Sequence, residues 1–289
     1  MAWPGAFDPR LVDSTIGKSM VVTAEHDIDA AALAAECVVR IHERLVDHLR
    51  AGQTLAEIDG FIAGCLKDLQ CKSAFLRYKI PGHPPFPSYS CLSVNHCIVH
   101  GTHNMSDEPV KPGDILSVDI GVIHQGWFGD AAWTYAIEHA RDEDLRLMRC
   151  GRESLRRGVE AIQPDRPLMD WARTVQEYVE GECGFHLVRG LGGHGYGRKL
   201  HNPPFVSNVG PTNPSEWPDA WKTFQPGMLL AVEPMLATGT AGITSEQRKW
   251  PIYTADGSLS VHYEADVLVT PEGPRNLTGA MEALPDVVG

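Results

Sequence analysis

The sequence predicts an α+β fold in which two halves repeat the same order of elements. Three observations support this prediction. Stretches with apolar residues at three- and four-residue steps predict helices, and stretches rich in Gly and Pro with short apolar runs predict strands. The order helix, helix, strands then occurs twice along the chain, which indicates internal duplication of structure. Because no self-similarity of sequence accompanies it, an unrelated α+β arrangement is the alternative.

The first half opens with two predicted helices. From Thr23 apolar residues recur at helical spacing until about Gly52. The predicted apolar face of this helix consists of Ala30, Leu33, Cys37, Ile41, Leu45 and Leu49. The second helix begins with a capping box, in which Thr54 is followed by Glu57 at the third helical position. Its predicted apolar face consists of Ile58, Phe61, Ile62, Cys65, Leu66 and Leu69.

The strands of the first half follow these helices. Residues 73–111 are rich in Pro, Gly, Ser and aromatic residues and contain the short strand-like pieces Cys91–Val94 and Cys97–Val99. Residues 115–137 predict two strands joined around His124–Gln125.

The second half repeats this order. We expect helices at about Asp142–Ile162 and Leu168–Cys183, and strands near Met228–Glu233 and Ser260–Thr270. Residues 1–22 show no clear period and carry Pro and Gly, so they predict an irregular N-terminal arm. No low-complexity linker divides the remainder, and we expect a single domain at 23–289.

Composition excludes several classes of protein. The chain has 289 residues, of which 43% are hydrophobic, with 28 Gly and 21 Pro, so a disordered chain, a collagen-like repeat and a disulfide scaffold are excluded. The formal net charge is −12 and no run of five basic residues occurs, so we expect no nucleic-acid partner.

Cysteine usage and the start of the chain predict a cytoplasmic location. The chain has 7 Cys, an odd number, and no CxxC motif, which favours reduced thiols. The first twenty residues lack the basic start and apolar core of a signal peptide. No apolar run approaches the ~18 residues of a membrane span, so we expect no membrane partner.

Two aspartates stand in the predicted hairpin. Asp119 lies in an apolar strand, and Asp130 follows eleven residues later in the next strand. If the turn is centred between His124 and Gln125, the two residues face each other directly, with Cβ atoms ~4.5–5.5 Å apart. Like charges so placed are unfavourable unless a divalent cation binds them. The alternative is a different register with one Asp in solvent.

Two glutamates and a histidine extend this case. Glu233 follows the strand-like run MLLAV, and a charge at the end of a buried strand needs a partner. Glu264 alternates with apolar residues in LSVHYEADVLVT and shares one face with His262 and Asp266, and an ordinary solvated face is the alternative. His194 lies in the Gly-rich segment GLGGHGYG, where other groups can approach closely.

The charges of these five residues balance two divalent ions. Four carboxylates and one neutral imidazole carry −4, and two divalent cations carry +4. Oxygen-rich sites with one imidazole suit Mn, Fe, Co or Zn. A dinuclear site with metals ~3.5–4 Å apart is a common means of activating water and polarising a carbonyl.

These residues and spacings resemble the methionine aminopeptidase family, bacterial type I, from about residue 20 to the end of the chain. The resemblance lies in two aspartates eleven apart and in the motifs GHGYG, VEPM and HYEADVLVT. In that family the matching residues hold two divalent metal ions, here Asp119, Asp130, His194, Glu233 and Glu264. The resemblance also implies the pita-bread (creatinase/aminopeptidase) fold, with two pseudo-symmetric halves.

The resemblance further implies catalytic histidines and a reaction. His100, in NHCIVHGT, matches the histidine that hydrogen-bonds the substrate near the scissile amide. His201, seven residues after His194, matches the one that contacts the substrate carbonyl and stabilises the tetrahedral intermediate. The implied reaction removes the N-terminal methionine of peptides and nascent proteins by metal-hydroxide attack on the first peptide carbonyl, with Glu233 as proton shuttle.

The substrate pocket is implied in part. Cys91, nine residues before His100, and Trp250, fourteen before Glu264, match pocket residues of the family. Phe86 and His83 stand where relatives usually have Tyr. Sulfur and aromatic edges suit a methionine thioether, although core packing is an alternative for each residue, for Phe86 above all.

Several residues depart from the family pattern. Leu200 stands where an aromatic residue is common, Asn202 where many members have Glu, and the sequence after His100 reads GTHN. Together with His83, these departures leave the expected metal centre intact but bear on substrate preference. They motivate the hypothesis of a divergent paralogue with an altered substrate.

An Xaa-Pro peptidase of the same fold is a second hypothesis, since it would share the metal ligands. Those enzymes generally carry a separate N-terminal domain, however, and only about twenty irregular residues precede the first helix here. A non-catalytic binding protein would usually lack metal ligands, and all five are present. We expect a monomer. The ribosome is a partner to be tested, although no zinc-finger extension or long basic arm argues for it.

Overall fold

The computed structural model describes residues 21–289, so the predicted arm at 1–22 lies almost entirely outside the described residues. Within them the predicted order is confirmed. Helices α1 (Glu25–Val46) and α2 (Leu55–Asp68) precede the strands of the first half. Helices α3 (Asp142–Ala161) and α4 (Met169–Gln176), the latter extended by the π-helix η1 (Glu177–Cys183), precede those of the second.

The predicted capping box at the start of α2 is confirmed. Glu57 N donates to Thr54 Oγ1 at 3.3 Å, and Thr54 N donates to Glu57 Oε2 at 2.8 Å. These bonds satisfy two backbone donors that a helix N-terminus otherwise leaves unpaired, and they fix where α2 begins.

The predicted face of α1 is wrong at one position. Leu33 is 37% exposed, whereas Ala31, Ala34 and Ala35 are fully buried. The reason is the close approach of the helix to strand β5, where a Cβ placed on Gly129 would lie 2.7 Å from the backbone of Ala34. The contact therefore uses small residues instead of leucine.

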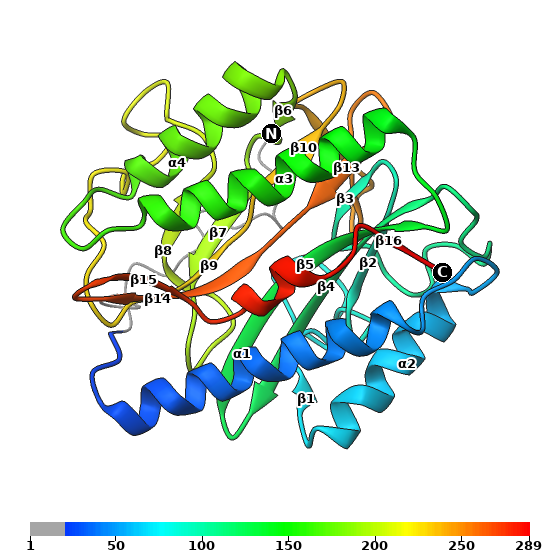
Figure 1. The fold of residues 1–289 in the computed structure, drawn as a ribbon, viewed down its shortest axis with the longest axis horizontal. Coiled ribbons are helices and arrows are strands. Elements are labelled where there is room, and N and C mark those ends of the chain that lie inside the picture. Colours follow the sequence, from blue (N-terminus) through cyan, green and yellow to red (C-terminus); the bar gives the residue numbers. More distant parts are fainter. Residues whose placement is uncertain (1–20) are drawn as a thin grey trace.

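Two five-stranded sheets form the centre of the molecule (Figure 1). The first sheet has the order β1-β4-β5-β16, with β2 also paired to β4. Its strands are β1 (Lys72–Ser73), β2 (Cys91–Val94), β4 (Ile115–His124), β5 (Trp127–Ile137) and β16 (Val287–Val288). The second sheet has the order β15-β14-β9-β7-β8. Its strands are β7 (Gly192–Gly195), β8 (Asn202–Ser207), β9 (Leu229–Val232), β14 (Ala265–Thr270) and β15 (Gly273–Asn276).

Two three-stranded sheets and a short helix complete the described fold. One small sheet joins β6 (His186–Leu187), β10 (Met235–Ala237) and β13 (Ser260–His262), and the other joins β3 (Cys97–Val99), β11 (Ile243–Ser245) and β12 (Ile252–Thr254). The 3₁₀-helix η2 spans Gly279–Ala283. The strand predicted over Ser260–Thr270 is thus divided into β13 and β14, with Tyr263 and Glu264 between them.

The two large sheets meet where β5 lies beside β14, a line that we call the seam. Glu264 N donates to Ala132 O at 2.9 Å, and Asp130 N donates to the Asp266 carboxylate at 2.9 Å. In Figure 1, α1 crosses in front of β4 and β5, and α3 crosses in front of the strands of the second half. The helices therefore cover an outer face of the sheets, and the seam residues Asp130, Ala132 and Asp266 are buried.

The hairpin register differs from the predicted one. Asp119 pairs with Ala132, and Asp130 pairs with Gly121, so the two aspartates are diagonal neighbours on the same face of the sheet. The prediction that they face each other directly is wrong because the turn is centred one residue later. Gln125 and Gly126 form a two-residue turn with φ of 49° and 81°, a backbone twist that matches the twist of paired strands.

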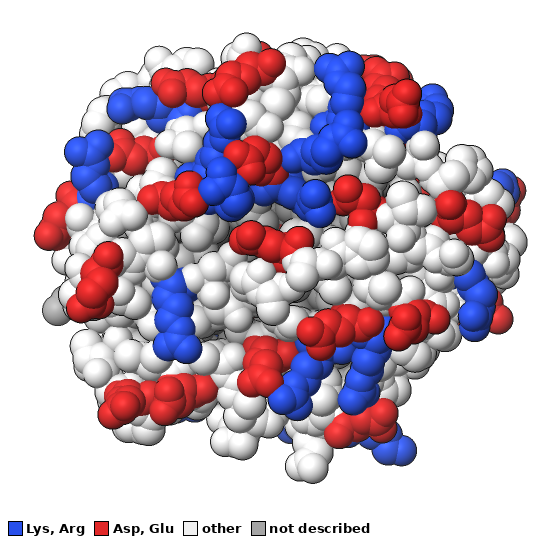
Figure 2. Space-filling view, viewed as in Figure 1, with Lys and Arg blue, Asp and Glu red and all other residues white. Residues whose placement is uncertain are grey.

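The outer surface of α3 carries charges of both signs. Arg156 contacts Glu153 at 2.8 Å, and Arg157 contacts Glu182 at 3.0 Å. Figure 2 shows basic and acidic side chains interspersed across this face of the molecule. Exposed pairs of this kind contribute little to stability. Within residues 21–289, no helix is both long and apolar enough to cross a membrane.

The contact between α1 and β5 gives a test of the fold. We expect Gly129→Ala to lower the free energy of unfolding by about 1–3 kcal/mol, since the added methyl would push against the Ala34 backbone. Gly64→Ala is the matched control, because its Cβ would meet nothing within 4 Å on α2. There the exchange should stabilise the protein by about 0.5–1 kcal/mol through helix propensity. Equal effects in urea denaturation would contradict the packing of α1 described here.

Candidate metal centre and substrate pocket

Five side chains predicted as metal ligands converge at the seam. Asp119 comes from β4, Asp130 from β5, His194 from β7, Glu233 from the residue after β9, and Glu264 from the link between β13 and β14. His194 Nε2 lies 3.9 Å from Asp130 Oδ2 and 3.9 Å from Glu233 Oε1. The ligand atoms of Asp130, His194 and Glu264 lie within 4.8 Å of one another. The sequence-predicted residues are therefore neighbours in space, although they come from both halves of the chain.

Burial makes these carboxyl groups hold their protons when no cation is bound. Burial, with the charge of Glu233 as a smaller cause, raises the pKa of Asp119 to about 8. Burial followed by neighbouring carboxylates raises the pKa values of Asp130, Glu233 and Glu264 well above their usual range. Burial also lowers the pKa of His194 to about 4, so its imidazole is neutral and able to coordinate a metal.

The donor set fits divalent cations. Asp119 Oδ1 and Asp130 Oδ1 are buried without a hydrogen-bond partner among the described residues, and such atoms are costly unless a cation binds them. Oxygen donors with one imidazole match the preferences of Mn, Fe, Co and Zn. The geometry therefore supports the metal assignment made from the sequence.

Two buried polar residues near the centre received no role from the sequence. His262 Nε2 lies 3.2 Å from Glu233 Oε2, and Asp266 accepts the hydrogen bond from Asp130 N. The hydroxyls of Ser117 and Thr134 each accept a hydrogen bond at 3.2 Å from the backbone N–H of His262. The sequence pattern that could have identified these residues was the alternation of His262, Glu264 and Asp266 in an otherwise apolar segment. It did not reveal that all three are buried.

The two predicted catalytic histidines lie beside the centre. The ring of His201 is 4.4 Å from that of His194, and the ring of His100 is 6.2 Å from that of Trp250. His100 has a φ of 58°, a left-handed conformation that is uncommon for a non-glycine residue and often found at functional sites. Burial lowers the pKa of His100 to about 4 and that of His201 well below its ordinary value. Both imidazoles are therefore neutral hydrogen-bonding groups.

The residues predicted to form the substrate pocket belong to an apolar cluster that adjoins the carboxylates. Cys91, in this cluster, is the cross-strand partner of Asp119 in the pairing of β2 with β4. Phe86 and Trp250 pack edge to face with ring centres 5.2 Å apart, and His83 lies 5.3 Å from Trp250. These residues, all predicted from the sequence, are neighbours here. The buried members of the cluster are Ala74, Phe75, Phe86, Cys91, Leu200 and Trp250.

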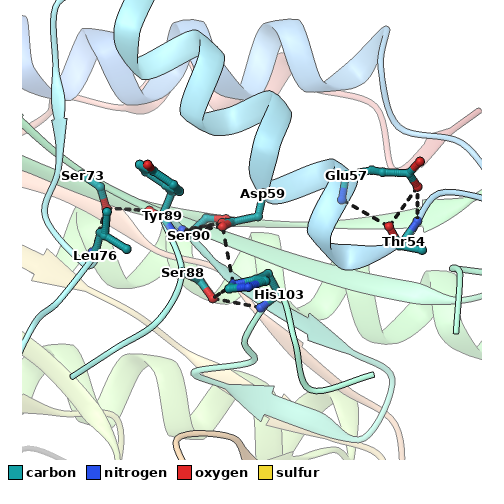
Figure 3. Close-up of polar contacts among 9 residues, drawn as sticks. All are labelled: Thr54, Glu57, Asp59, Ser73, Leu76, Ser88, Tyr89, Ser90 and His103. Atoms are coloured by element: carbon teal, nitrogen blue, oxygen red, sulfur yellow. Dashed lines mark hydrogen bonds and ion pairs between the residues drawn. The ribbon is translucent and has the colours of Figure 1, made fainter. Parts of the chain in front are cut away.

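A buried carboxylate holds the loop between Phe86 and Cys91 in place (Figure 3). Asp59, on α2, accepts hydrogen bonds from Tyr89 N at 3.1 Å and from Ser90 N at 2.9 Å. The Ser90 hydroxyl adds a third at 2.8 Å. This anchor fixes the approach of the chain into β2, where Cys91 begins the strand.

The same region contains a serine, a histidine and an aspartate but no nucleophilic triad. His103 Nδ1 faces both Ser88 Oγ at 2.9 Å and Asp59 Oδ2 at 3.8 Å, as Figure 3 shows. A triad needs the serine and the aspartate on opposite ring nitrogens. Ser88 is also fully buried, so no substrate could reach it. The arrangement is structural.

Comparison with known proteins identifies the family to which this chain belongs. Residues 29–271 match the family model described as Metallopeptidase family M24, and the chain belongs to this family. Among curated relatives, it is 34% identical over 259 residues to the methionine aminopeptidase of Clostridium perfringens, covering 90% of this chain and 98% of that protein. It is also 34% identical over 245 residues to methionine aminopeptidase 1 of Bacillus subtilis, covering 85% and 93%.

Solved structures agree with this placement. The methionine aminopeptidase of Rickettsia prowazekii matches with a TM-score of 0.82 and 28% identity, covering 90% of this chain and 100% of that one. That of Thermotoga maritima matches with a TM-score of 0.80 and 31% identity, covering 90% and 99%. A prolidase from Pyrococcus furiosus, at 18% identity and a TM-score of 0.66 over 89% of this chain and 65% of that one, shares the fold alone. The pita-bread fold and the family resemblance are thus confirmed.

The raised carboxyl pKa values predict how stability depends on pH. In the folded, chelator-treated protein, Asp119 keeps its proton up to about pH 8, whereas in the unfolded chain it ionises near pH 4. The protonated Asp119 of the folded protein therefore contributes fully to stability below about pH 4. This contribution is lost progressively as the pH rises from about 4 through 8. The buried histidines have lowered pKa values and affect the pH dependence of stability in the opposite direction. They do so only below about pH 6.5, because above this pH a histidine is neutral in both the folded and the unfolded chain.

We accordingly expect the Tm of the chelator-treated protein to fall between about pH 6.5 and 8. Added Mn should raise the Tm by an amount that grows with pH, because the ligands bind metal in their ionised form. Differential scanning calorimetry measures both quantities. A Tm of the chelator-treated protein that stays level or rises over this range would contradict the protonation described here.

Proposed function

We propose that this chain is a metal-dependent aminopeptidase that removes the N-terminal methionine from peptides and nascent proteins. The observation that carries the proposal is the position of the apolar cluster that would form the pocket. Cys91 lies directly opposite Asp119 in the sheet, so a side chain held against Cys91 and Trp250 brings its own backbone to the carboxylates. Similarity to proteins named methionine aminopeptidase over nearly their whole length supports the same conclusion.

In this proposal Asp119, Asp130, His194, Glu233 and Glu264 hold two divalent ions, which would be Co, Mn, Fe or Zn. When bound, the ions would supply Lewis-acid polarisation of the scissile carbonyl and activation of water. Residues 23–289 act as one catalytic domain. Support comes from the buried core cluster, which includes residues from both halves of the chain.

Three residues of the chain would fill the other roles in catalysis. Glu233, whose side chain is 12% exposed, is the ligand with the most access to solvent and is suited to take a proton and pass it to the leaving amine. His201 would donate a hydrogen bond to the carbonyl oxygen as negative charge develops there. His100 would hold the substrate near the scissile amide.

The pocket would take the methionine side chain. Cys91, Phe86 and Trp250 offer sulfur and aromatic edges, and the Trp250 indole N–H is already bonded to Pro84 O at 3.0 Å. The indole therefore presents its ring to the pocket without an unpaired donor. His83 and Leu200 shape the same wall and would tune which side chains fit.

Cellular context is part of the proposal. Six of the seven cysteines are buried and all seven are free thiols, which supports work in the reducing cytoplasm on newly made chains. We propose that the enzyme acts as a monomer, with the ribosome as a partner to be tested.

Release of free methionine from Met-Ala-Ser tests the activity. We expect release with added Mn or Co and none with excess chelator. Leu-Ala-Ser and Ala-Pro-Ser serve as matched substrates, and both should be cleaved far more slowly. Preferential cleavage of Ala-Pro-Ser would favour an Xaa-Pro peptidase. Bound metal with no cleavage of Met-Ala-Ser would favour a paralogue in which His83, Leu200 and Asn202 select another substrate.

Asp119→Asn tests the metal centre. The amide keeps the size of the side chain but removes a ligand charge, so we expect metal-dependent release of methionine to be lost. Metal content by atomic absorption should fall in parallel. Full activity with the wild-type metal content would refute the role of Asp119.

His201→Ala tests the hydrogen-bond donor at the carbonyl. We expect kcat to fall on the order of 10²–10³, with a smaller change in KM, because charge on the oxygen develops mainly in the transition state. Steady-state kinetics with Met-Ala-Ser separates the two constants. An unchanged kcat would exclude this role.

A further inference from the structure

Tyr78 lies beside the metal centre but has no part in the reaction proposed above. It belongs to the loop between β1 and β2. Its hydroxyl lies 2.6 Å from Nδ1 of His201, a contact that joins residues 123 positions apart. The two rings are 5.3 Å apart. A short, long-range hydrogen bond to a residue expected to touch substrate indicates a functional part for Tyr78.

The backbone holds Tyr78 in position on both sides. Tyr78 N donates to Phe75 O at 2.8 Å, and Phe86 N donates to Tyr78 O at 2.9 Å. Arg77, which precedes it, donates its backbone N–H to Phe86 O at 2.8 Å and has a φ of 64°. The loop therefore ties Tyr78 to the pocket wall at Phe86. The hydroxyl consequently has a fixed position relative to both the pocket and His201.

The contact between Tyr78 and His201 joins two groups that can each donate or accept in their neutral forms. A histidine imidazole is ordinarily neutral above about pH 6.5, and burial raises the pKa of the Tyr78 phenol. A neutral imidazole carries one proton, and its position on Nδ1 or Nε2 depends on what each nitrogen contacts. At 2.6 Å, one of the two groups must donate to the other.

The phenol is the better donor of the pair. If Nδ1 donated instead, the acceptor would be a phenol oxygen, which is a weaker base than an imidazole nitrogen, and the Tyr78 hydroxyl proton would need a second acceptor. If the phenol donates, Nδ1 accepts and the imidazole proton lies on Nε2. This arrangement satisfies both groups with a single hydrogen bond.

We propose that Tyr78 is a positioning residue that holds His201 as the Nε2–H tautomer, with its remaining N–H ready to donate to the substrate carbonyl. The statement about the carbonyl rests on the proposed function, whereas the tautomer does not. His201 would otherwise divide between two tautomers, one of which presents a lone pair to the developing negative charge and repels it. Fixing the donor before substrate binds avoids reorganisation during the reaction.

Nuclear magnetic resonance of the imidazole nitrogens tests the tautomer without any assay of activity. The probe is the zinc-loaded protein labelled with ¹⁵N-histidine, with the His201 signals assigned by their loss in His201→Gln. We expect His201 of the wild type to carry its proton on Nε2, and Tyr78→Phe to shift the population towards Nδ1–H. A wild-type protein protonated on Nδ1, or a Tyr78→Phe protein with an unchanged tautomer, would overturn the proposal.

Kinetics tests the consequence for catalysis. Tyr78→Phe keeps the ring and its packing, so we expect kcat for Met-Ala-Ser to fall on the order of 10–10², as for other residues that orient a functional histidine, with KM nearly unchanged. In a His201→Ala background the same change should have no further effect, because Tyr78 would act through His201. Additive losses, or a loss confined to KM, would contradict this part of the proposal.

Tyr178→Phe is the matched control. It also removes only a phenol hydroxyl, but from η1 on the outer side of the second half, and kcat should be unchanged. If the wild type released no methionine, the proposed function would fail, and the nitrogen spectra would still decide the tautomer. The two failures are therefore distinguishable.

Discussion

The gathering of four carboxyl groups in the interior is the constraint on which the rest of the structure depends. Asp119, Asp130, Glu233 and Glu264 are mutually repulsive when ionised and poorly solvated where they lie. The fold can tolerate them only as protonated acids or as ligands of cations. Every nearby feature, from the seam to the neutral histidines, is consistent with the second state as the working one.

The seam explains how the chain brings these groups together. Each large sheet contributes some of the ligands, and the hydrogen bonds from Glu264 N to Ala132 O and from Asp130 N to Asp266 join the sheets where the ligands lie. The same bonds satisfy backbone donors that would otherwise be buried without partners. The ligand geometry is therefore a property of how the two halves pack, and helices on an outer face of the sheets leave the interior to the site.

Much of this arrangement could be predicted from the sequence. The helix periods, the capping box at Thr54 and the identity of the carboxylates are local signals, and the family motifs identified His194, Glu233 and Glu264 together. The cross-strand partner of Asp119 could not be predicted from such local signals. Gln125 and Gly126 both adopt positive φ, and glutamine is not a residue that usually marks such a turn. A shift of the turn by one residue moved the partner of Asp119 from Asp130 to Ala132.

The features that the sequence did not predict are mainly contacts between segments that are far apart in the chain. Tyr78 meets His201 across 123 residues, and His262 meets Glu233 because β13 and the end of β9 approach each other in space. Neither contact leaves a period or a motif in the sequence. The apolar cluster was predicted only in part. Cys91, Phe86 and Trp250 were expected from the family resemblance, whereas the sequence did not predict that Ala74 and Phe75 pack beside them.

The central claim is that buried, protonated carboxyl groups exchange their protons for two divalent cations. Calorimetric titration of the chelator-treated protein with Mn at neutral pH, repeated in buffers of different ionisation enthalpy, measures the ions bound and the protons released together. The account predicts two ions per chain and a net release of protons, because ligands with raised pKa values must ionise to bind. Binding of fewer than two ions per chain, or binding without proton release, would contradict it.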